Sequence, residues 1–376
     1  MAMKKTMLHL PHELIIEIFL RLPVKSLISF KCVCKSWFSI ISDTYFTNLH
    51  FELTSATHTQ RVLFISSTSP NKFRSIDLEL SHDDDNASAS PNFPSFMHCE
   101  PCSLREIKGS CRGFILFLYI DLSFYLWNPS TGVHKNIPLS PLSFILEGKV
   151  DYFYGFGYDR STDDYLIVSM PYDINTSYLE FFSLRANQWK QIDEGTHHIR
   201  YSNATEDCRE EGLLFNGVIH WFAHRNDLKK DFIVAFDLME RKLLEMNLPD
   251  EFDHELHSCG VWVFQEFLSL WAMDYDYDHD YDYDYYTLEI WVMKEYKVHS
   301  SWTKTRVLLT DSIPSNYFSP RTCTKGGDIF GLDSCARFVK YNDEGQFSGH
   351  HSYSDDPYVA MYTESLLSLP EDNLQP

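Results

Sequence analysis

One pair of cysteines and two pairs of histidines are spaced closely enough to suggest a metal site. Cys99 and Cys102 form a single C-x-x-C pair, but no second pair follows at the distance that a zinc finger needs. His197–His198 and His350–His351 are adjacent pairs, so in a strand the two side chains point to opposite faces and make poor joint ligands. We therefore expect an ordinary loop at the cysteines, surface histidines, and no metal or other cofactor.

Motifs of enzymes are also missing from the sequence. It contains no G-x-S-x-G, no H-E-x-x-H, no phosphate loop and no dinucleotide fingerprint. His220 and Trp221 follow an apolar run, which favours a place in a hydrophobic core. We predict a chain without catalytic residues. An oxidase or a lectin-like protein remains an alternative, which metal analysis or glycan binding would reveal.

Residues 10–43 have the helical spacing that the rest of the chain lacks. Pro11 suits the first turn of a helix, and apolar residues between 14 and 22 recur on one face. Pro23 predicts the end of this helix at Leu22, followed by a second helix from Lys25 to about residue 34 and a shorter third one. So small a unit cannot bury all its apolar surface internally. The surface must meet either the following domain or a partner protein.

This segment resembles a plant-type F-box, nearly position for position. The matching residues are Leu10-Pro11, Glu13, Ile18, the run 21–27, the run 32–35 and Trp37. The resemblance implies binding to the SKP-type adaptor of a cullin ubiquitin ligase. The residues that it implies for this surface, or for its support, are Leu10, Pro11, Leu14, Ile18, Leu22, Pro23, Val24, Leu27, Cys32, Val33 and Trp37.

Composition and charge limit the possible partners. The net charge is −21 over 376 residues, with +3 in the first fifty residues and −24 in the remainder. An acidic body disfavours nucleic acid and anionic membranes as partners. No run approaches the roughly twenty apolar residues of a membrane span, and no signal peptide is evident. The nine cysteines follow no disulfide framework, so we expect a reducing cytoplasm or nucleus.

From Phe51 onward, short strand-like runs alternate with turns and repeat at an even spacing. The anchoring aromatic residues Trp127, Phe182, Phe236 and Trp291 are separated by 55, 54 and 55 residues, and Phe338 follows 47 later. A first copy is expected within residues 61–78. A period of about fifty is typical of a four-stranded blade of a kelch-like propeller.

Four further runs look like inner strands, apolar on both faces: 113–118, 165–168, 217–222 and 328–332. We therefore predict an α+β chain by composition, with a three-helix module at 1–50 and an all-β propeller of about six blades at 51–376. Five to seven blades fit the count. A two-sheet sandwich is the alternative, and the even spacing disfavours it.

The second half also resembles a family, the F-box-associated domain of plant proteins. The similarity lies in GSCRGFILF, LWNPSTGVHKNIP, YGFGYDRSTDDYLIV, LFNGVIHWFA, IVAFDLMERKLLEMNLP, IWVMKEYKVHSSWTK and the late YTESLLSL. Some members of that family resemble the S-locus F-box proteins of pollen, and the sequence does not select that subgroup over the others. Residues 81–96 are predicted to form a flexible loop, and the Asp/Tyr run at 274–286 a solvated hairpin extension rather than a calcium loop.

Together the two resemblances imply a substrate-recognition subunit of an SCF-type ubiquitin ligase. The helices would bind the adaptor and, through it, the cullin, while the propeller would bind an unknown protein target. Target contacts are expected in loops 140–150, 193–210, 250–260 and 274–286. The segment 44–60 has no Pro/Gly run, which favours a rigid joint. The alternative is an F-box scaffold acting outside a ligase.

Overall fold

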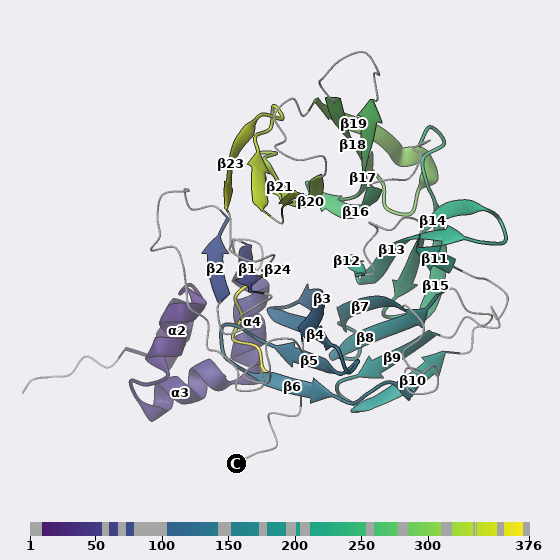
Figure 1. The fold of residues 1–376 in the computed structure, drawn as a ribbon. Helices are drawn as coiled ribbons and strands as arrows, with labels where there is room; N and C mark the ends of the chain where they lie inside the picture. The colour runs from purple at the N-terminus through teal and green to yellow at the C-terminus, as the bar shows by residue number, and fades with distance from the viewer. Residues whose placement is uncertain are drawn as a thin grey trace, which may run out of the picture.

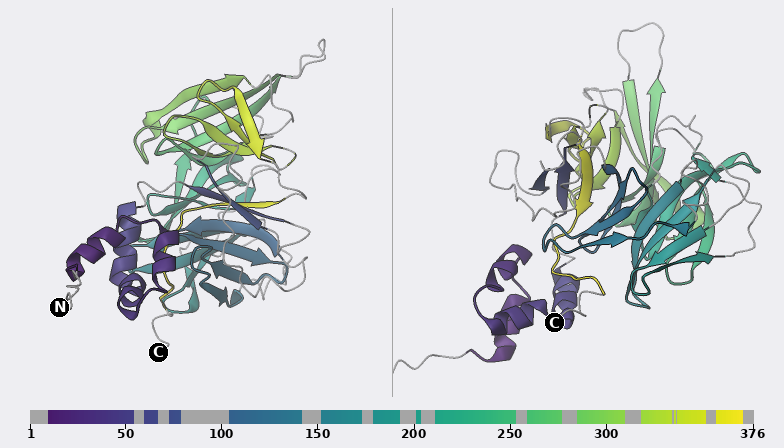
Figure 2. Two further views of the ribbon diagram at one scale, coloured as in Figure 1. Left: turned by 90° about the vertical axis from the view of Figure 1, so that its left-hand side faces the viewer. Right: turned by 60° about the horizontal axis from the view of Figure 1, so that its bottom comes forward.

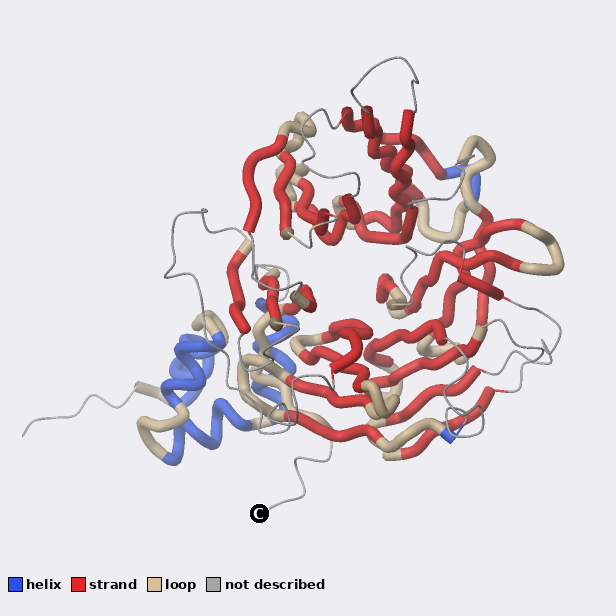
Figure 3. Tube along the Cα trace, viewed as in Figure 1, coloured by secondary structure: helices blue, strands red, loops and turns tan. Residues whose placement is uncertain are grey.

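The computed structural model contains a small helical module packed against a ring of strands (Figure 1). It describes residues 10–54, 60–66, 73–78, 104–141, 152–172, 179–192, 201–203, 211–252, 259–276, 285–309, 318–333, 335, 337–351 and 357–370. Figure 3 shows that the N-terminal helices gather at one side of a ring built of strands. The predicted combination of an N-terminal helical module and an all-β propeller is confirmed.

The helical module has four helices, one more than the sequence predicted. They are α1 (His12–Phe19), α2 (Val24–Phe30), α3 (Lys35–Ser42) and α4 (Thr44–Thr54). The first two begin directly after Pro11 and Pro23, as expected from the fixed φ of proline. The fourth follows Asp43, whose Oδ1 accepts a hydrogen bond from the Phe46 N–H at 2.9 Å. This side chain caps the N-terminus of α4. The segment 44–60 was expected to be a joint, and the structure instead places a helix over Thr44–Thr54.

Six sheets form the propeller, and each is one blade. Blade one contains β3 (Leu104–Cys111), β4 (Phe114–Tyr119), β5 (Phe124–Trp127) and β6 (His134–Ile137); blade two contains β7 (Tyr152–Asp159), β8 (Asp164–Pro171), β9 (Leu179–Ser183) and β10 (Gln188–Ile192). Blade three contains β11 (Tyr201–Asn203), β12 (Leu213–Phe215), β13 (Val218–Arg225), β14 (Lys230–Asp237) and β15 (Lys242–Asn247). Blade four contains β16 (Cys259–Phe264), β17 (Phe267–Asp276), β18 (Tyr285–Met293) and β19 (Trp302–Leu309); blade five contains β20 (Phe318–Cys323), β21 (Ile329–Asp333), β22 (Phe338–Tyr341) and β23 (Phe347–His351).

The sixth blade joins the two ends of the propeller. It contains β24 (Tyr358–Tyr362), β1 (Arg61–Ile65) and β2 (Phe73–Asp77) in the order β2-β1-β24. Strands β1 and β24 pair antiparallel, with Leu63 opposite Ala360. A strand from near the C-terminus therefore closes the ring and protects the edge of β1.

The repeat found in the sequence corresponds to a fixed position in the blades. The five anchoring aromatic residues all lie on the strand that pairs with the outermost one: Trp127 on β5, Phe182 on β9, Phe236 on β14, Trp291 on β18 and Phe338 on β22. The runs predicted as inner strands are the second strands of their blades, β4, β8, β13 and β21, and not the innermost ones, which lie next to them. Most of their residues are buried, as expected. His220 and Trp221 are each 1% exposed, which confirms their predicted place in a core.

A C-terminal strap, residues 363–369, fastens the helical module to the propeller. It follows β24 and is drawn in yellow beside α4 (Figure 2). Leu366 packs into the core of the helices with Phe19 and Leu27. Leu367 and Leu369 instead pack into the core between blades one and two. Neighbouring residues of one segment are thus buried in two different modules.

Hydrogen bonds hold this strap in register on blade one. The side-chain amide of Asn128, which is fully buried, donates to the carbonyl oxygens of Ser365 and Leu367, each at 3.2 Å. The Ser365 hydroxyl donates to the Arg112 carbonyl at 3.0 Å. Gly113 has a φ of +85°, and a Cβ there would lie 2.2 Å from the Ser365 Oγ, so glycine is required where the strap crosses.

The Arg112 side chain forms the second link between the modules. Its guanidinium lies 4.7 Å from the ring centroid of Phe51 on α4 and 4.2 Å from that of Tyr158 on β7. It also donates to Glu52 and to Asn48, both on α4, at 2.7 Å. Arginine suits this position because its planar group can stack and form hydrogen bonds at once.

Replacing Leu366 by alanine is expected to destabilise the helical module rather than the propeller. The lost packing should cost about 2–5 kcal/mol, because Leu366 is 3% exposed within the helical core. Hydrogen exchange should accelerate in α1–α4 and stay slow in β7–β9. Leu367→Ala is the matched control, with faster exchange expected in blades one and two. Equal effects of both variants on both modules would contradict this division of the strap.

His220 is expected to make stability depend on pH. Burial lowers its pKa from 6.5 to about 4 because it disfavours the imidazolium. The unfolded chain then binds the proton more readily, so the contribution is complete above pH 6.5 and is lost as pH falls toward 4. Between about pH 6.5 and 5 the loss is about 2 kcal/mol. Urea unfolding should show that His220→Gln lacks this part of the pH dependence, whereas the exposed-site variant His134→Gln keeps it.

Candidate functional site

The structure divides the eleven residues predicted for adaptor binding into internal and exposed ones. Val24 and Leu27 are fully buried in the helical core. Leu22 and Trp37 are half-buried and pack against the same core. These four hold the helices together. The other seven are exposed: Leu10, Pro11, Leu14, Ile18, Pro23, Cys32 and Val33.

An aromatic cluster fixes the helices that carry the exposed residues. The ring of Trp37 on α3 lies 5.0 Å from that of Phe19 on α1, edge to face, and 5.2 Å from that of Phe30 on α2. Behind it, the His50 Nε2–H on α4 donates to the Leu22 carbonyl at 2.9 Å, because a carbonyl can only accept. Burial lowers the pKa of His50, so the ring stays neutral at physiological pH. Tertiary contacts therefore hold α1 and α2 in place.

The exposed surface on α1 is an apolar stripe. Leu14 and Ile18 lie four residues apart on α1, so they share one side of the helix, and they are 50% and 47% exposed. Leu10, which precedes the Pro11 cap of this helix, is 56% exposed. Val33, in the turn after α2, is 60% exposed. The only residue that α1 buries is Phe19. Ile15 and Ile16 pack partly against the same core, and the side of α1 with Leu14 and Ile18 stays uncovered.

A groove opens on the other side of α1. It has a volume of about 480 Å³ and is lined by His12 and Ile16 of α1, Ile40 of α3, and Tyr45 and Leu49 of α4, among others. Ile16 lies about 200° around the helix from both Leu14 and Ile18. Both flanks of α1 are therefore accessible to a partner that reaches around the helix.

Sequence reasoning missed part of this surface. Phe38 is 54% exposed and Tyr45 is 77% exposed. Phe38 lies on a different side of its helix from Trp37, Ile40 and Ile41, which face the core. This difference in helical position could have predicted from the sequence that Phe38 is exposed. Tyr45 lies on α4, which was not predicted, so its accessibility had no signal before that helix was recognised.

Charge differs between the helical module and the rest of the chain. The first fifty residues carry +3, and Lys25 on α2 and Lys35 on α3 are exposed. Arg21 forms an exposed ion pair with Glu17 along α1 at 2.9 Å. The remainder of the chain carries −24. Basic groups on the helical module favour a partner that is acidic there.

The helical module lies at one face of the propeller, because Arg112 in the turn between β3 and β4 contacts α4. Strands alternate in direction, so all turns between first and second strands lie at this face. The strand ends that flank loops 140–150, 193–210, 250–260 and 274–286 lie at the opposite face. Most residues of these loops are outside the described ranges, as are residues 81–96. The pairing of Asp276 with Tyr285 confirms that the Asp/Tyr run joins two paired strands.

The described residues contain no metal-binding constellation. No group of three or more His, Cys, Asp or Glu could hold an ion within these ranges. Cys99, Cys102 and His197–His198 lie outside them. His350 and His351 are consecutive residues of β23, as expected for a pair that points to opposite faces. No described helix has the length and apolar content that crossing a membrane requires.

Comparison with known proteins identifies both parts of the chain. The F-box domain model matches residues 7–49, and the F-box associated beta propeller domain model matches residues 50–341. An F-box/kelch-repeat protein of Arabidopsis thaliana is 28% identical over 303 residues, covering 79% of this chain and 78% of the relative. Another F-box protein of the same plant is 26% identical over 362 residues, covering 89% and 84%.

Among solved structures, TolB from Acinetobacter baumannii is similar with a TM-score of 0.42 and 10% identity, covering 85% of this chain and 72% of that one. A likeness of this degree carries no argument about function. The two family models cover the helices and most of the propeller, and they agree with the architecture. The chain belongs to the plant F-box proteins that carry an F-box associated β-propeller domain.

Proposed function

We propose that this chain is the substrate-recognition subunit of an SCF-type cullin ubiquitin ligase. The observation that supports this most is the uncovered apolar stripe of α1, held in place by an internal core that does not need those residues. An F-box that served only as a cap on the propeller would turn this stripe inward. Here α4 and the strap make the contacts with the propeller, and α1 remains accessible.

The adaptor surface in this proposal consists of the seven exposed residues. Leu14 and Ile18 would contact the SKP-type adaptor along α1, and Leu10, Pro11, Pro23, Cys32 and Val33 would extend the surface around the helix ends. Leu22, Val24, Leu27 and Trp37 would support it from inside. Phe38 and Tyr45 join the proposed surface because of their exposure.

The mechanism would be proximity rather than chemistry by this chain. The adaptor would connect the F-box to the cullin, and the propeller would hold a protein target in the cytoplasm or nucleus. Holding the lysines of the target near a ubiquitin-charged enzyme converts a bimolecular encounter into an effectively intramolecular one. The strap and the Arg112 contacts favour this mechanism because they limit movement between the two modules.

A non-catalytic scaffold that acts outside a ligase is the second candidate. It would use the same exposed helices for a different partner. Two observations disfavour this candidate: the F-box motif of the sequence is nearly complete, and the helical core of the structure is intact. Binding to a purified adaptor separates the two candidates directly.

The double substitution Leu14→Ala/Ile18→Ala is expected to weaken adaptor binding about a hundredfold. Each residue is about half exposed in the free chain, and losing the burial of both at an interface costs about 3 kcal/mol. Affinity for a purified SKP-type adaptor, measured by isothermal titration, checks this. The circular dichroism of the variant should stay unchanged, because neither residue is buried in the helical core.

Leu228→Ala is the matched control, since Leu228 is 53% exposed in a turn of blade three. It should leave the affinity unchanged. Leu27→Ala should also reduce binding, but through loss of helix stability that circular dichroism and thermal unfolding detect. If a folded wild-type chain does not bind the adaptor, the ligase proposal fails and the scaffold becomes the better account.

A further inference from the structure

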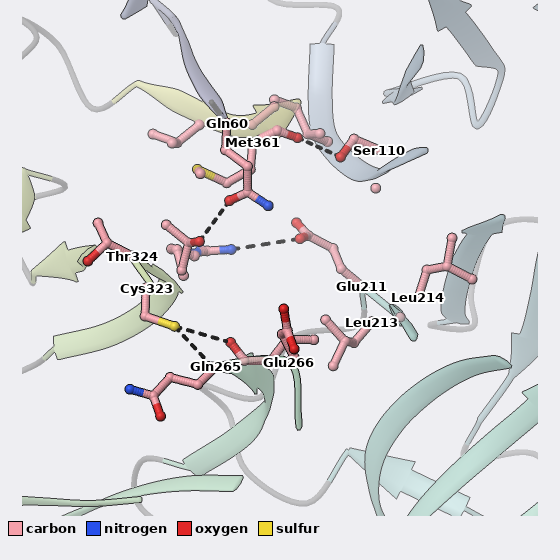
Figure 4. Close-up of a pocket in the computed structure, with 18 of the residues that line it drawn as sticks. Gln60, Ser110, Glu211, Leu213, Leu214, Gln265, Glu266, Cys323, Thr324 and Met361 are labelled. Carbon is pink, nitrogen blue, oxygen red and sulfur yellow. Dashed lines mark hydrogen bonds and ion pairs between the residues drawn. The ribbon is translucent and has the colours of Figure 1, made fainter. Parts of the chain in front are cut away.

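A cavity of about 430 Å³ lies where the inner strands of the propeller meet, at the end nearest the F-box. Figure 4 shows residues of several blades around it. Its apolar walls include Ile107 of β3, Leu213 of β12, Val263 of β16 and Met361 of β24. Because different blades contribute these residues, closing the ring creates the cavity.

An ion pair crosses this cavity. Arg321, on β20, lies with its Nη1 3.8 Å from the Glu211 carboxylate, which precedes β12. The side chains are 21% and 33% exposed. A separation of 3.8 Å is long for a direct hydrogen bond, so the pair is loose and a group entering between the strands can compete for the carboxylate.

A second carboxylate reaches the same cavity from a strained turn. Glu266 and Gln265 form the two-residue turn between β16 and β17, with φ values of +75° and +48°. Turns of this kind usually contain glycine or asparagine. Here both positions carry long polar side chains that line the cavity. Within the described ranges, the exposed Glu266 carboxylate forms no ion pair or hydrogen bond.

We propose that this cavity accepts a lysine or arginine side chain of the target protein, an inference that rests on the proposed role in target recognition. The apolar walls suit the methylene stem of such a side chain, and Glu211 and Glu266 suit its charged end. The overall charge also favours a basic ligand, because the chain after residue 50 carries −24 and attracts positive charge over a long range. Two cations oppose the same ligand, namely Lys325, exposed at the rim, and Arg321, with which the ligand must compete for Glu211.

The position of the cavity adds a geometric argument. The turn at 265–266 joins the first and second strands of its blade, so it lies at the face that carries Arg112 and α4. A target held there would sit on the F-box side of the propeller. Its lysines would then be close to the side on which the adaptor binds in the proposed ligase.

Titration of the full chain, in complex with an SKP-type adaptor, with a capped Gly-Gly-Arg-Gly-Gly peptide tests this site. The probe is followed through the 13C-labelled methyl group of Met361, with the exposed Met239 as a reference within the same molecule. We expect saturable shifts at Met361 with a dissociation constant of about 1 mM, as one side chain can supply. The same peptide with citrulline, the neutral isostere of arginine, should not bind.

Substitutions of opposite sign make the test specific. Glu266→Gln should weaken binding about fivefold, because it removes a carboxylate that accepts charge-assisted hydrogen bonds. Lys325→Gln should strengthen it about twofold, because it removes a like charge. Glu344→Gln, at an exposed acid in a turn of blade five outside the cavity, should change nothing.

Absence of saturable shifts, or equal weakening by Glu266→Gln and Glu344→Gln, would overturn the assignment of the cavity. Equal binding of the citrulline peptide would overturn the role of charge. Adaptor affinity is measured on the same samples. Intact adaptor binding without peptide binding therefore removes only this inference, whereas loss of adaptor binding in the wild-type chain removes the ligase proposal itself.

Discussion

The pairing of β1 with β24 is the contact on which the rest of the structure depends. It joins segments separated by about three hundred residues, so its formation completes the ring and creates the cavity between the inner strands. The same pairing also determines the position of the segment that follows β24. The segment that leaves β24 passes over blade one to the helices, because β24 ends at the face where they lie. Ring closure and attachment of the F-box are therefore one structural event.

The strap explains how a module of four short helices keeps so much apolar surface uncovered. A unit of this size has too little interior for a stable core. Leu366 adds to that core from outside, and the Arg112 contacts anchor α4 to the propeller. The helices can then be stable while Leu10, Leu14 and Ile18 remain exposed. The surface for a partner is retained because the stability comes from elsewhere in the chain.

Features with a local or periodic signal could be predicted from the sequence. The helix breaks at Pro23, the blade anchors such as Trp127 and the buried strands all have such a signal. Helix α4 also had a local signal, the N-cap residue Asp43, but the segment 44–60 was interpreted as a joint between the modules. The Glu211–Arg321 pair had no such signal, and the family resemblance of the strap did not show what the strap contacts. In both cases the partners are more than a hundred residues apart, and only the closed ring brings them together. Val24 and Leu27 could not be separated from the exposed residues for another reason, because their burial depends on how the short helices pack against one another.

Rigid attachment and a recognition site at the F-box face reinforce each other. The effective concentration of a tethered group falls as the connection becomes longer or more flexible, so a site on the adaptor side needs the least reach. The strap and Arg112 would preserve this advantage by holding α4 against the blade turns. A basic partner would be drawn first by the acidic body and then oriented by individual carboxylates at the cavity. Attraction over a long range and selection at short range would thus be separate properties of one propeller.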